Sequence, residues 1–480
     1  MLDPADWESF RAAAHRALDD AVDYLRDVRE RPAWQPVPQS VKAELAEPLP
    51  ADGAPFAAVY AQFARAILPY ATGNIHPRFW GWVHGSGTPG GAVAELLAAT
   101  MNANVGGRDH AAVYVERQVI AWFRELFGLP GADGGVLLTG TSAANLVALL
   151  AARTRALGSG VRKHGVYAGG ERLRAYASSA THACVRKAFE MAGLGSDTLR
   201  VLPADAAHRL DLQLLRRTVE SDINSGLRPF FVVANAGSVD AGAIDDLAAV
   251  AGIASAFDLW FHVDGAFGAA ACLSPRLQPK FEGIERADSI AFDFHKWLHV
   301  PYDAGCVLIR DPEIERATFA GGGPYFRRMP RGTGAGEPWF ADYGPDLSRG
   351  FRALKIWFTI KEHGASGLAR AIQRNCDQAR TLYDRLTADP DFEPLLEPEL
   401  QIVCFRPRGG GLEPAQIDRL IDESVMSLQE SGVAVISTTT IGGRRAMRLC
   451  ITNHRTEDAD LEEALGALRS IVRDGRDAPT

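Results

Sequence analysis

Between residues 90 and 310, short apolar runs alternate with longer stretches of helical periodicity. Apolar residues recur at every third or fourth position over 91–103, 112–128, 142–157, 182–193, 211–225 and 245–257. The intervening runs are 136–138, 174–177, 230–234, 260–263, 289–292 and 306–309. This alternation predicts an α/β domain with a mainly parallel sheet flanked by helices. Ligands of such sheets bind beyond the carboxyl ends of the strands, so the residues after each run are the first functional candidates.

An N-terminal segment precedes this α/β region. Residues 6–31 and 55–69 have helical spacing, and the Pro-rich stretch between them must be extended or looped. Such a helical arm has little core of its own. We therefore expect residues 1–85 to lie on another part of the molecule, with a second subunit as one candidate, and residues 86–360 to form the large domain.

The C-terminal part of the chain has a different pattern. Residues 349–388 predict long helices, and 400–480 follow the order strand, helix, strand, strand, helix. This order is typical of a small α+β domain, which we assign to residues 361–480. Residues 316–348 are rich in Gly, Pro and Arg and have little periodicity. A stretch this long without regular structure usually marks a functional loop.

Composition restricts the partners and the location. The chain has 51 Lys and Arg against 59 Asp and Glu, a net charge of -8, whereas nucleic-acid binding requires a basic surface. The longest apolar stretches are far too short for a membrane span, and the N-terminus does not resemble a signal peptide. The six cysteines are scattered and the twelve histidines show no paired ligand spacing. We expect reduced thiols, a cytoplasmic location and no metal.

Two residues suggest a cofactor site when they are taken together. Lys296 lies in the segment FDFHKW, directly after an apolar run, and Asp264 ends the run in WFHVDGA. Taken alone, Lys296 fits a solvated turn residue and Asp264 fits a helix cap. As a pair they fit a lysine that forms an imine and a carboxylate that keeps a cofactor's pyridine nitrogen protonated.

Three further segments follow other strand candidates. LTGTSAAN at 138–145 opens a helix with Gly and hydroxyl residues, which suits either an anion site or an ordinary N-cap. His182 lies near the start of the next helix, where an imidazole can stack on a cofactor ring or serve as an ordinary polar residue. Ser238 follows another strand and is a candidate hydrogen-bonding group. No Walker lysine or complete GxGxxG motif supports nucleotide binding.

In chain order, the segments TGTS, SATH, HVDGA and DFHKW resemble the group II decarboxylases that depend on pyridoxal 5′-phosphate (PLP), the family of aromatic-L-amino-acid and glutamate decarboxylases. The resemblance covers most of the chain, from the N-terminal arm, which includes NIHPRFW at 74–80, to RLCITN at 448–453. It implies PLP as the cofactor, fold type I of the PLP enzymes, and an obligate homodimer with the active site at the interface.

The resemblance also implies a role for each matching residue. Lys296 holds the cofactor as a Schiff base, Asp264 pairs with the pyridine nitrogen, and His182 stacks on the ring. The other cofactor contacts that it implies are Thr141 and Ser142 at the phosphate, His295 nearby, Ser238 and Ala266 along the ring, and Asp293 near the phosphate and the lysine. The implied reaction releases CO2 from an L-amino acid and leaves the corresponding amine.

Tyr325 bears on the type of reaction. Counting from Lys296, it matches the mobile-loop tyrosine that donates a proton in the family's decarboxylases, where aldehyde synthases commonly have phenylalanine. Tyr325 and His182 therefore favour simple decarboxylation. The preceding Gly-Gly-Gly-Pro departs from the family pattern. An aldehyde synthase or a carbon–carbon lyase is the alternative enzyme, and a catalytically silent binding protein is the alternative outside catalysis.

The substrate pocket permits two interpretations. Trp80, Trp82 and Val83 suit an aromatic side chain, with His84 adding a polar group, although these aromatic residues fit core packing equally well. Asn102 and Asn104 lie in a polar segment that is more like the glutamate decarboxylases. The arm favours the aromatic branch, so we expect an aromatic or related bulky L-amino acid, with a polar or acidic one such as glutamate as the alternative.

Overall fold

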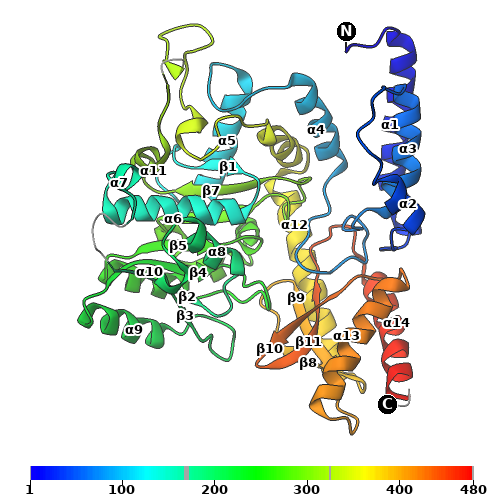
Figure 1. Cartoon of the computed structure of the whole chain (residues 1–480). Coiled ribbons are helices and arrows are strands. Elements are labelled where there is room, and N and C mark those ends of the chain that lie inside the picture. Colours follow the sequence, from blue (N-terminus) through cyan, green and yellow to red (C-terminus); the bar gives the residue numbers. More distant parts are fainter. Residues whose placement is uncertain (1, 167–171, 324–325, 478–480) are drawn as a thin grey trace.

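The computed structural model describes residues 2–166, 172–323 and 326–477. A seven-stranded sheet in the order β1-β7-β6-β5-β4-β2-β3 forms the centre of the larger domain (Figure 1). Its strands are β1 (Val136–Leu138), β2 (Leu173–Ser178), β3 (Leu199–Leu202), β4 (Arg228–Asn235), β5 (Trp260–Asp264), β6 (Ser289–Asp293) and β7 (Gly305–Ile309). Only β7 runs opposite to the others, so the remaining strands end at one edge of the sheet.

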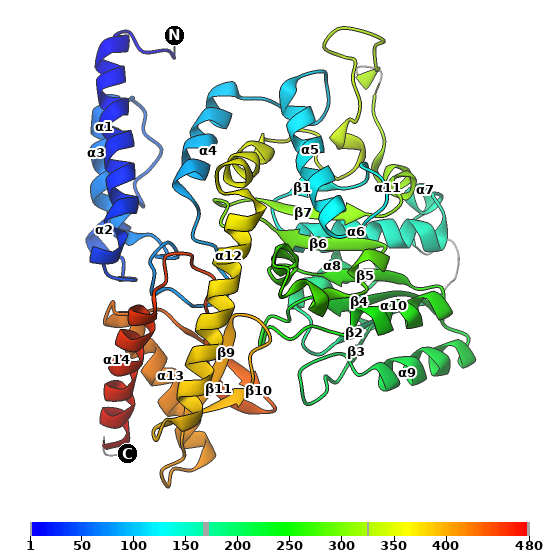
Figure 2. The same ribbon diagram turned by 180° about the vertical axis from the view of Figure 1, so that it is seen from behind.

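Helices cover both faces of this sheet, as the alternating sequence pattern predicts. Helix α6 lies on one face, and α5 and the start of α12 lie on the other (Figures 1 and 2). The helices of this region are α4 (Pro89–Met101), α5 (Ala111–Leu126), α6 (Thr141–Leu157), α7 (Val161–His164), α8 (Ala183–Met191), α9 (Leu212–Asn224), α10 (Leu247–Ala256) and α11 (Pro312–Phe319). The central strands are buried, which explains their continuous apolar runs.

A second, antiparallel sheet in the order β10-β11-β9-β8 organises the C-terminal part. Its strands are β8 (Phe392–Leu396), β9 (Ile402–Pro407), β10 (Ser437–Ile441) and β11 (Arg444–Cys450), and its helices are α13 (Pro414–Glu430) and α14 (Asp458–Asp477). Helix α12 (Arg352–Ala388) connects the two sheets and is interrupted at Gly364, where φ is 67°. The sequence pattern did not predict the edge strands β3 and β8, which carry Arg200 and Pro394 within short apolar runs.

The N-terminal arm contains α1 (Trp7–Arg26), α2 (Gln39–Glu44) and α3 (Phe56–Ala66); α1 lies against α3, and the chain that follows α1 contacts the small domain (Figure 2). Arg29 forms an ion pair with Asp460 on α14, and the Ala33 amide donates to the Gly432 carbonyl at 2.8 Å. Short 3-10 helices complete the fold at Val28–Glu30, Leu68–Tyr70, Ser196–Thr198, Gly268–Leu273, Gln278–Phe281, Ile284–Arg286 and Phe340–Asp342. No helix in the described ranges is both long and apolar enough to cross a bilayer.

Candidate active site

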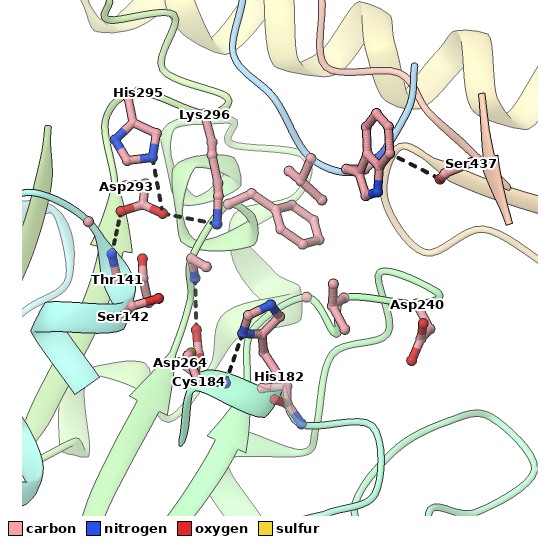
Figure 3. A pocket seen from close by; sticks show the side chains of 18 of the residues that line it. Thr141, Ser142, His182, Cys184, Asp240, Asp264, Asp293, His295, Lys296 and Ser437 are labelled. Atoms are coloured by element: carbon pink, nitrogen blue, oxygen red, sulfur yellow. Dashed lines mark hydrogen bonds and ion pairs between the residues drawn. The ribbon is translucent and has the colours of Figure 1, made fainter. Parts of the chain in front are cut away.

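A cavity of about 540 Å³ opens at the edge where the parallel strands end. The turns after β1, β2, β4, β5 and β6 all contribute to its wall, together with residues of the arm and the small domain (Figure 3). Of the residues predicted from sequence, ten line it: Trp82, Val83, Thr141, Ser142, His182, Asp264, Ala266, Asp293, His295 and Lys296. The sheet thus gathers residues that lie more than 150 positions apart in the chain, from Thr139 to Lys296.

Lys296 enters the cavity directly after β6 and forms an ion pair there. Its Nζ lies 2.9 Å from Asp293 Oδ2, while Asp293 Oδ1 accepts a 2.7 Å hydrogen bond from the Thr141 amide. Burial disfavours the charged amine, but Asp293 and then Asp264 outweigh it, so the pKa of Lys296 lies above its usual range. Asp293 therefore fixes the lysine relative to the start of α6.

Asp264 is the buried carboxylate at the end of β5. Its Oδ2 accepts from Asn145 Nδ2 at 2.9 Å, and its Oδ1 accepts from the Ala266 amide at 3.2 Å. Burial raises the pKa of this carboxyl, and the hydrogen bond from Asn145 and the charge of Lys296 partly offset that effect. A carboxylate in this position is suited to pair with a positively charged group inside the cavity.

The start of α6 forms a candidate anion-binding site at the edge of the cavity. Gly140 is the N-cap and provides no side-chain cap, and the buried Thr141 Oγ1 has no hydrogen-bond partner. A buried hydroxyl without a partner costs free energy unless a ligand satisfies it. Together with Ser142 and the dipole of α6, Thr141 forms an anion-binding site. It lies across the cavity from His182 (Figure 3).

Two histidines border the cavity. His182 caps α8 by accepting the Cys184 amide at its Nδ1 (3.2 Å), which leaves the ring beside the cavity (Figure 3). His295 accepts the Ala304 amide at its Nδ1 (3.0 Å), and its Nε2 lies 3.6 Å from Asp293. Burial lowers the pKa of His295, so its ring is neutral near pH 7.

Several predicted residues lie outside this cavity. Trp80 is fully buried in the core of the small domain, where its Nε1 donates to Thr456 Oγ1 at 3.1 Å, so it packs the core and does not line the pocket. Ser238 is buried and is not among the residues that line the cavity, and its Oγ accepts the Ala243 amide at 3.1 Å in a turn. Gly237 and Val239, its neighbours, line the wall instead.

The polar residues predicted for the substrate pocket have local roles. Asn102 ends α4 in a left-handed conformation, and Asn104 Oδ1 accepts the amides of Gly106 and Arg349 at 3.0 Å each. His84 lies beside the wall, with its Nδ1 3.4 Å from the Tyr302 hydroxyl. Both asparagines serve the helix end and the turn that follows it, and neither one lines the cavity of this chain. Tyr325 lies outside the described residues.

The structure also adds wall residues that the motifs did not identify: Cys184, Asn235, Asp240, Ser437, Thr438 and Arg448. Asn145 lies behind the wall. It is the last residue of the 138–145 segment, one helical turn after Thr141, but the sequence pattern did not indicate a role for it. Cys184 lies in the first turn of α8, Asn235 ends β4, Asp240 follows in the next turn, and the remaining three belong to the small domain. No sequence spacing links these residues to the cavity. Among the described residues, no group of three His, Cys, Asp or Glu side chains is arranged to hold a metal.

Comparisons with known proteins agree with this geometry. Residues 38–408 match the pyridoxal-dependent decarboxylase conserved domain. The chain is 30% identical over 473 residues to the aromatic-L-amino-acid decarboxylase of Bacillus atrophaeus, covering 97% of this chain and 96% of that protein. It is 29% identical to the phenylacetaldehyde synthase of Arabidopsis thaliana, with coverage of 97% and 96%.

A solved structure is similar to this chain along the whole length of both. The crystal structure of Oryza sativa TDC with PLP and tryptamine superposes with a TM-score of 0.89 and 27% sequence identity. The match covers 99% of each chain. The two-sheet architecture, the arm and the cavity edge therefore belong to a fold that is known to hold this cofactor.

Proposed function

Since the chain belongs to the pyridoxal-dependent decarboxylase family and is a PLP-dependent carboxy-lyase acting on an amino acid, we propose that its substrate is an aromatic L-amino acid, which it converts to the amine and CO2. The observation that carries the proposal is that Lys296 and Asp264 reach one cavity from neighbouring strand ends. The anion-binding site at Thr141 lies at the same edge of the sheet.

The residues present fit the cofactor. The unpartnered Thr141 hydroxyl, with Ser142, would hold the phosphate, and Lys296 Nζ would hold the cofactor covalently. Asp264 would face the pyridine nitrogen, and His182 would cover the ring, while the small Ala266 leaves room beside the backbone. When bound, PLP supplies an electrophilic aldehyde and a ring that accepts the electron pair left as CO2 departs.

The protein groups then direct the reaction. Asp264 would favour the protonated form of the ring nitrogen, because a negative charge directly beside a basic nitrogen stabilises its charged form. Asp293 holds Lys296 at 2.9 Å and is placed to accept its proton when the amine reacts. We propose Tyr325 as the donor that returns a proton to the substrate Cα, which rests on its position in the sequence.

The substrate class rests on the wall of the cavity and on the relatives. Trp82 and Val83 present an aromatic and an apolar surface at the mouth, which suits a bulky ring. A named relative at 30% identity is an aromatic-L-amino-acid decarboxylase. A second candidate is aldehyde formation, because a phenylacetaldehyde synthase is 29% identical over nearly the whole chain.

We also propose a homodimer in the cytoplasm. Large apolar side chains are exposed on α1, α3 and α4, including Trp7, Val59, Leu96 and Met101. An exposed apolar surface of this extent supports an interface with a second copy. The proposed division is an arm at 1–85, a large domain at 86–360 and a small domain at 361–480. The acidic composition, with a net charge of -8, supports an absence of nucleic-acid partners.

The test is to incubate the purified, PLP-loaded protein with a pool of L-amino acids and to identify the products by mass spectrometry. We expect an aromatic amine and CO2, both lost in Lys296→Ala. An amine from glutamate would replace the substrate proposal, and an aldehyde with peroxide would favour the second candidate. No turnover by a protein that holds PLP and has been tested with the whole pool would overturn the proposal.

A further inference from the structure

Behind Asp264 runs a line of buried polar side chains that the functional assignments above do not use. Asn145 Nδ2 lies 2.9 Å from Asp264 Oδ2, and Asn145 Oδ1 lies 2.9 Å from His262 Nε2. His262 Nδ1 is 2.8 Å from Ser289 Oγ, which accepts from Trp260 Nε1 at 2.7 Å. All five residues are at most 5% exposed. Because Trp260, His262 and Asp264 alternate along β5, their side chains share one face of the sheet, and the line runs along that face to the cavity carboxylate at the end of the strand.

The two ends of this line fix the direction of every hydrogen bond. When Asp264 is ionised it only accepts, so Asn145 turns its amide nitrogen toward Asp264, as its Nδ2 is placed, and its carbonyl toward His262. His262 must then carry its proton on Nε2, which leaves Nδ1 to accept from the Ser289 hydroxyl. At the other end the Trp260 indole donates only. Four hydrogen bonds thus point the same way, toward Asp264.

The line carries dipoles and no net positive charge. Burial lowers the pKa of His262 to about 3, so the imidazole is neutral at ordinary pH. Aligned hydrogen bonds polarise one another in a low-dielectric interior. Their positive ends meet at Asp264, where burial works against the ionised form. The line offsets that cost without placing a second cation that would compete with the cofactor's ring nitrogen.

The position of the line argues against a purely structural role. Strand β5 lies inside the sheet, between β4 and β6, where buried strands are normally apolar. Apolar side chains would fill this space without the desolvation cost of four polar groups. Here every polar group of the line has a partner, and the line ends at Asp264, one of the carboxylates that line the cavity.

We propose that Asn145 and His262, supported by Ser289 and Trp260, are positioning residues that hold Asp264 ionised and oriented toward the cofactor's ring nitrogen. The inference rests on the proposed function, since it takes Asp264 as the partner of that nitrogen. It assigns to the sheet interior a part in controlling the protonation of the ring.

The test compares His262→Leu, which removes both hydrogen bonds, with His262→Gln, whose amide nitrogen can still donate toward Asn145. Ser289→Ala removes only the outer part of the line. Tyr176→Phe is the matched control, because Tyr176 donates a buried hydrogen bond to Asp222 at 3.0 Å in the same sheet and is not linked to Asp264. Each variant is loaded with PLP labelled at the ring nitrogen, and the nitrogen NMR signal is followed against pH.

We expect His262→Leu to lose ring-nitrogen protonation at a lower pH than the unmodified protein, with kcat reduced about ten-fold and KM little changed. In Ser289→Ala the pH at which the ring nitrogen loses its proton should fall by a smaller amount. In His262→Gln this pH should lie close to that of the unmodified protein. A His262→Leu protein that keeps the original nitrogen signal and loses only thermal stability, as Tyr176→Phe should, would overturn the proposal. If His262→Leu does not fold, Ser289→Ala replaces it in the test. An unchanged nitrogen signal in Ser289→Ala would then overturn the proposal.

The nitrogen signal requires bound PLP and no turnover. It therefore distinguishes a failure of this inference from a failure of the proposed substrate, which the product analysis of the unmodified protein tests separately.

Discussion

The floor and the mouth of the cavity are built in different ways. We use floor for Thr141, Asp264, Asp293 and Lys296, and mouth for Trp82, Asp240, Ser437 and Thr438. The floor comes from the ends of neighbouring strands and the start of α6, and three of its four side chains are at most 5% exposed. At the mouth, Trp82 is 56% exposed and belongs to the arm, while Ser437 and Thr438 belong to the small domain.

This difference separates chemistry from recognition. Most polar groups of the floor have fixed partners, as a site that must orient reacting atoms requires. The mouth is made by loops and edges, which tolerate substitution more easily and commonly set specificity. Changes at the floor should therefore remove activity with any substrate, whereas changes at the mouth should change which substrate is preferred.

Asp264→Asn should give the largest effect. It removes the buried partner of the ring nitrogen, and breaking one side of a buried ion pair costs about 3–5 kcal/mol, so kcat should fall by about 100-fold or more. The thermal stability of the cofactor-free protein should not fall, because burial already disfavours this charge. Steady-state kinetics and thermal unfolding of the cofactor-free form measure the two effects. A kcat close to that of the unmodified protein would remove Asp264 from the floor's chemistry.

Thr141→Val should weaken cofactor binding. The Thr141 hydroxyl is buried without a partner in the chain, and a hydrogen bond to a charged group contributes about 1.5–3 kcal/mol, so the dissociation constant for PLP should rise about ten-fold or more. Thr141→Ser keeps the hydroxyl and should bind PLP nearly as well. Titration of the cofactor-free protein with PLP provides the measurement. Equal affinities for the Val and Ser variants would place the phosphate elsewhere.

Trp82→Ala tests the mouth. Loss of its ring should lower kcat/KM for a bulky aromatic amino acid by about ten-fold, the usual range for apolar pocket contacts. The value for a smaller amino acid should change less, and PLP affinity should stay the same. Competition between two substrates in one reaction measures the ratio directly. An equal loss for both substrates would show that Trp82 supports the floor and does not select the substrate.

Asp293→Asn should give a smaller effect, visible in the pH dependence of stability. Asp293 and Asp264 together hold the pKa of Lys296 above its usual value of 10.5. A raised lysine pKa contributes stability below the unfolded pKa, and that contribution is lost as pH rises through the folded pKa. Unfolding of the cofactor-free protein by denaturant should therefore show declining stability in this alkaline range. The decline should flatten in Asp293→Asn, and an unchanged slope would contradict the assigned ion pair.

The sequence predicted the floor better than the mouth. Asp264 and Asp293 directly follow an apolar run, and Thr141 and Lys296 lie within four residues of one. The rule that ligands bind at strand ends therefore pointed to these segments, and the family resemblance assigned a role to each residue. The family, the fold type and the cofactor that these motifs suggested are confirmed by the comparisons. Trp80 was misplaced because the spacing of aromatic residues does not distinguish a pocket from a core. Ser238 lies between two residues of the cavity wall, and its hydroxyl accepts an amide of its own turn, so its contact with the cofactor stays a prediction.

The local pattern by itself determined the alternation of strands and helices, the single edge at which the strands end, and the chemical groups that meet there. These follow from side-chain periodicity and from short segments in which neighbouring residues act together. Only the tertiary structure decided that Asn145 contacts Asp264 and His262 at once, and that residues 82, 240 and 437 share one wall. Such contacts join distant parts of the chain, and they are set by how the two sheets and the arm pack, which no local pattern encodes.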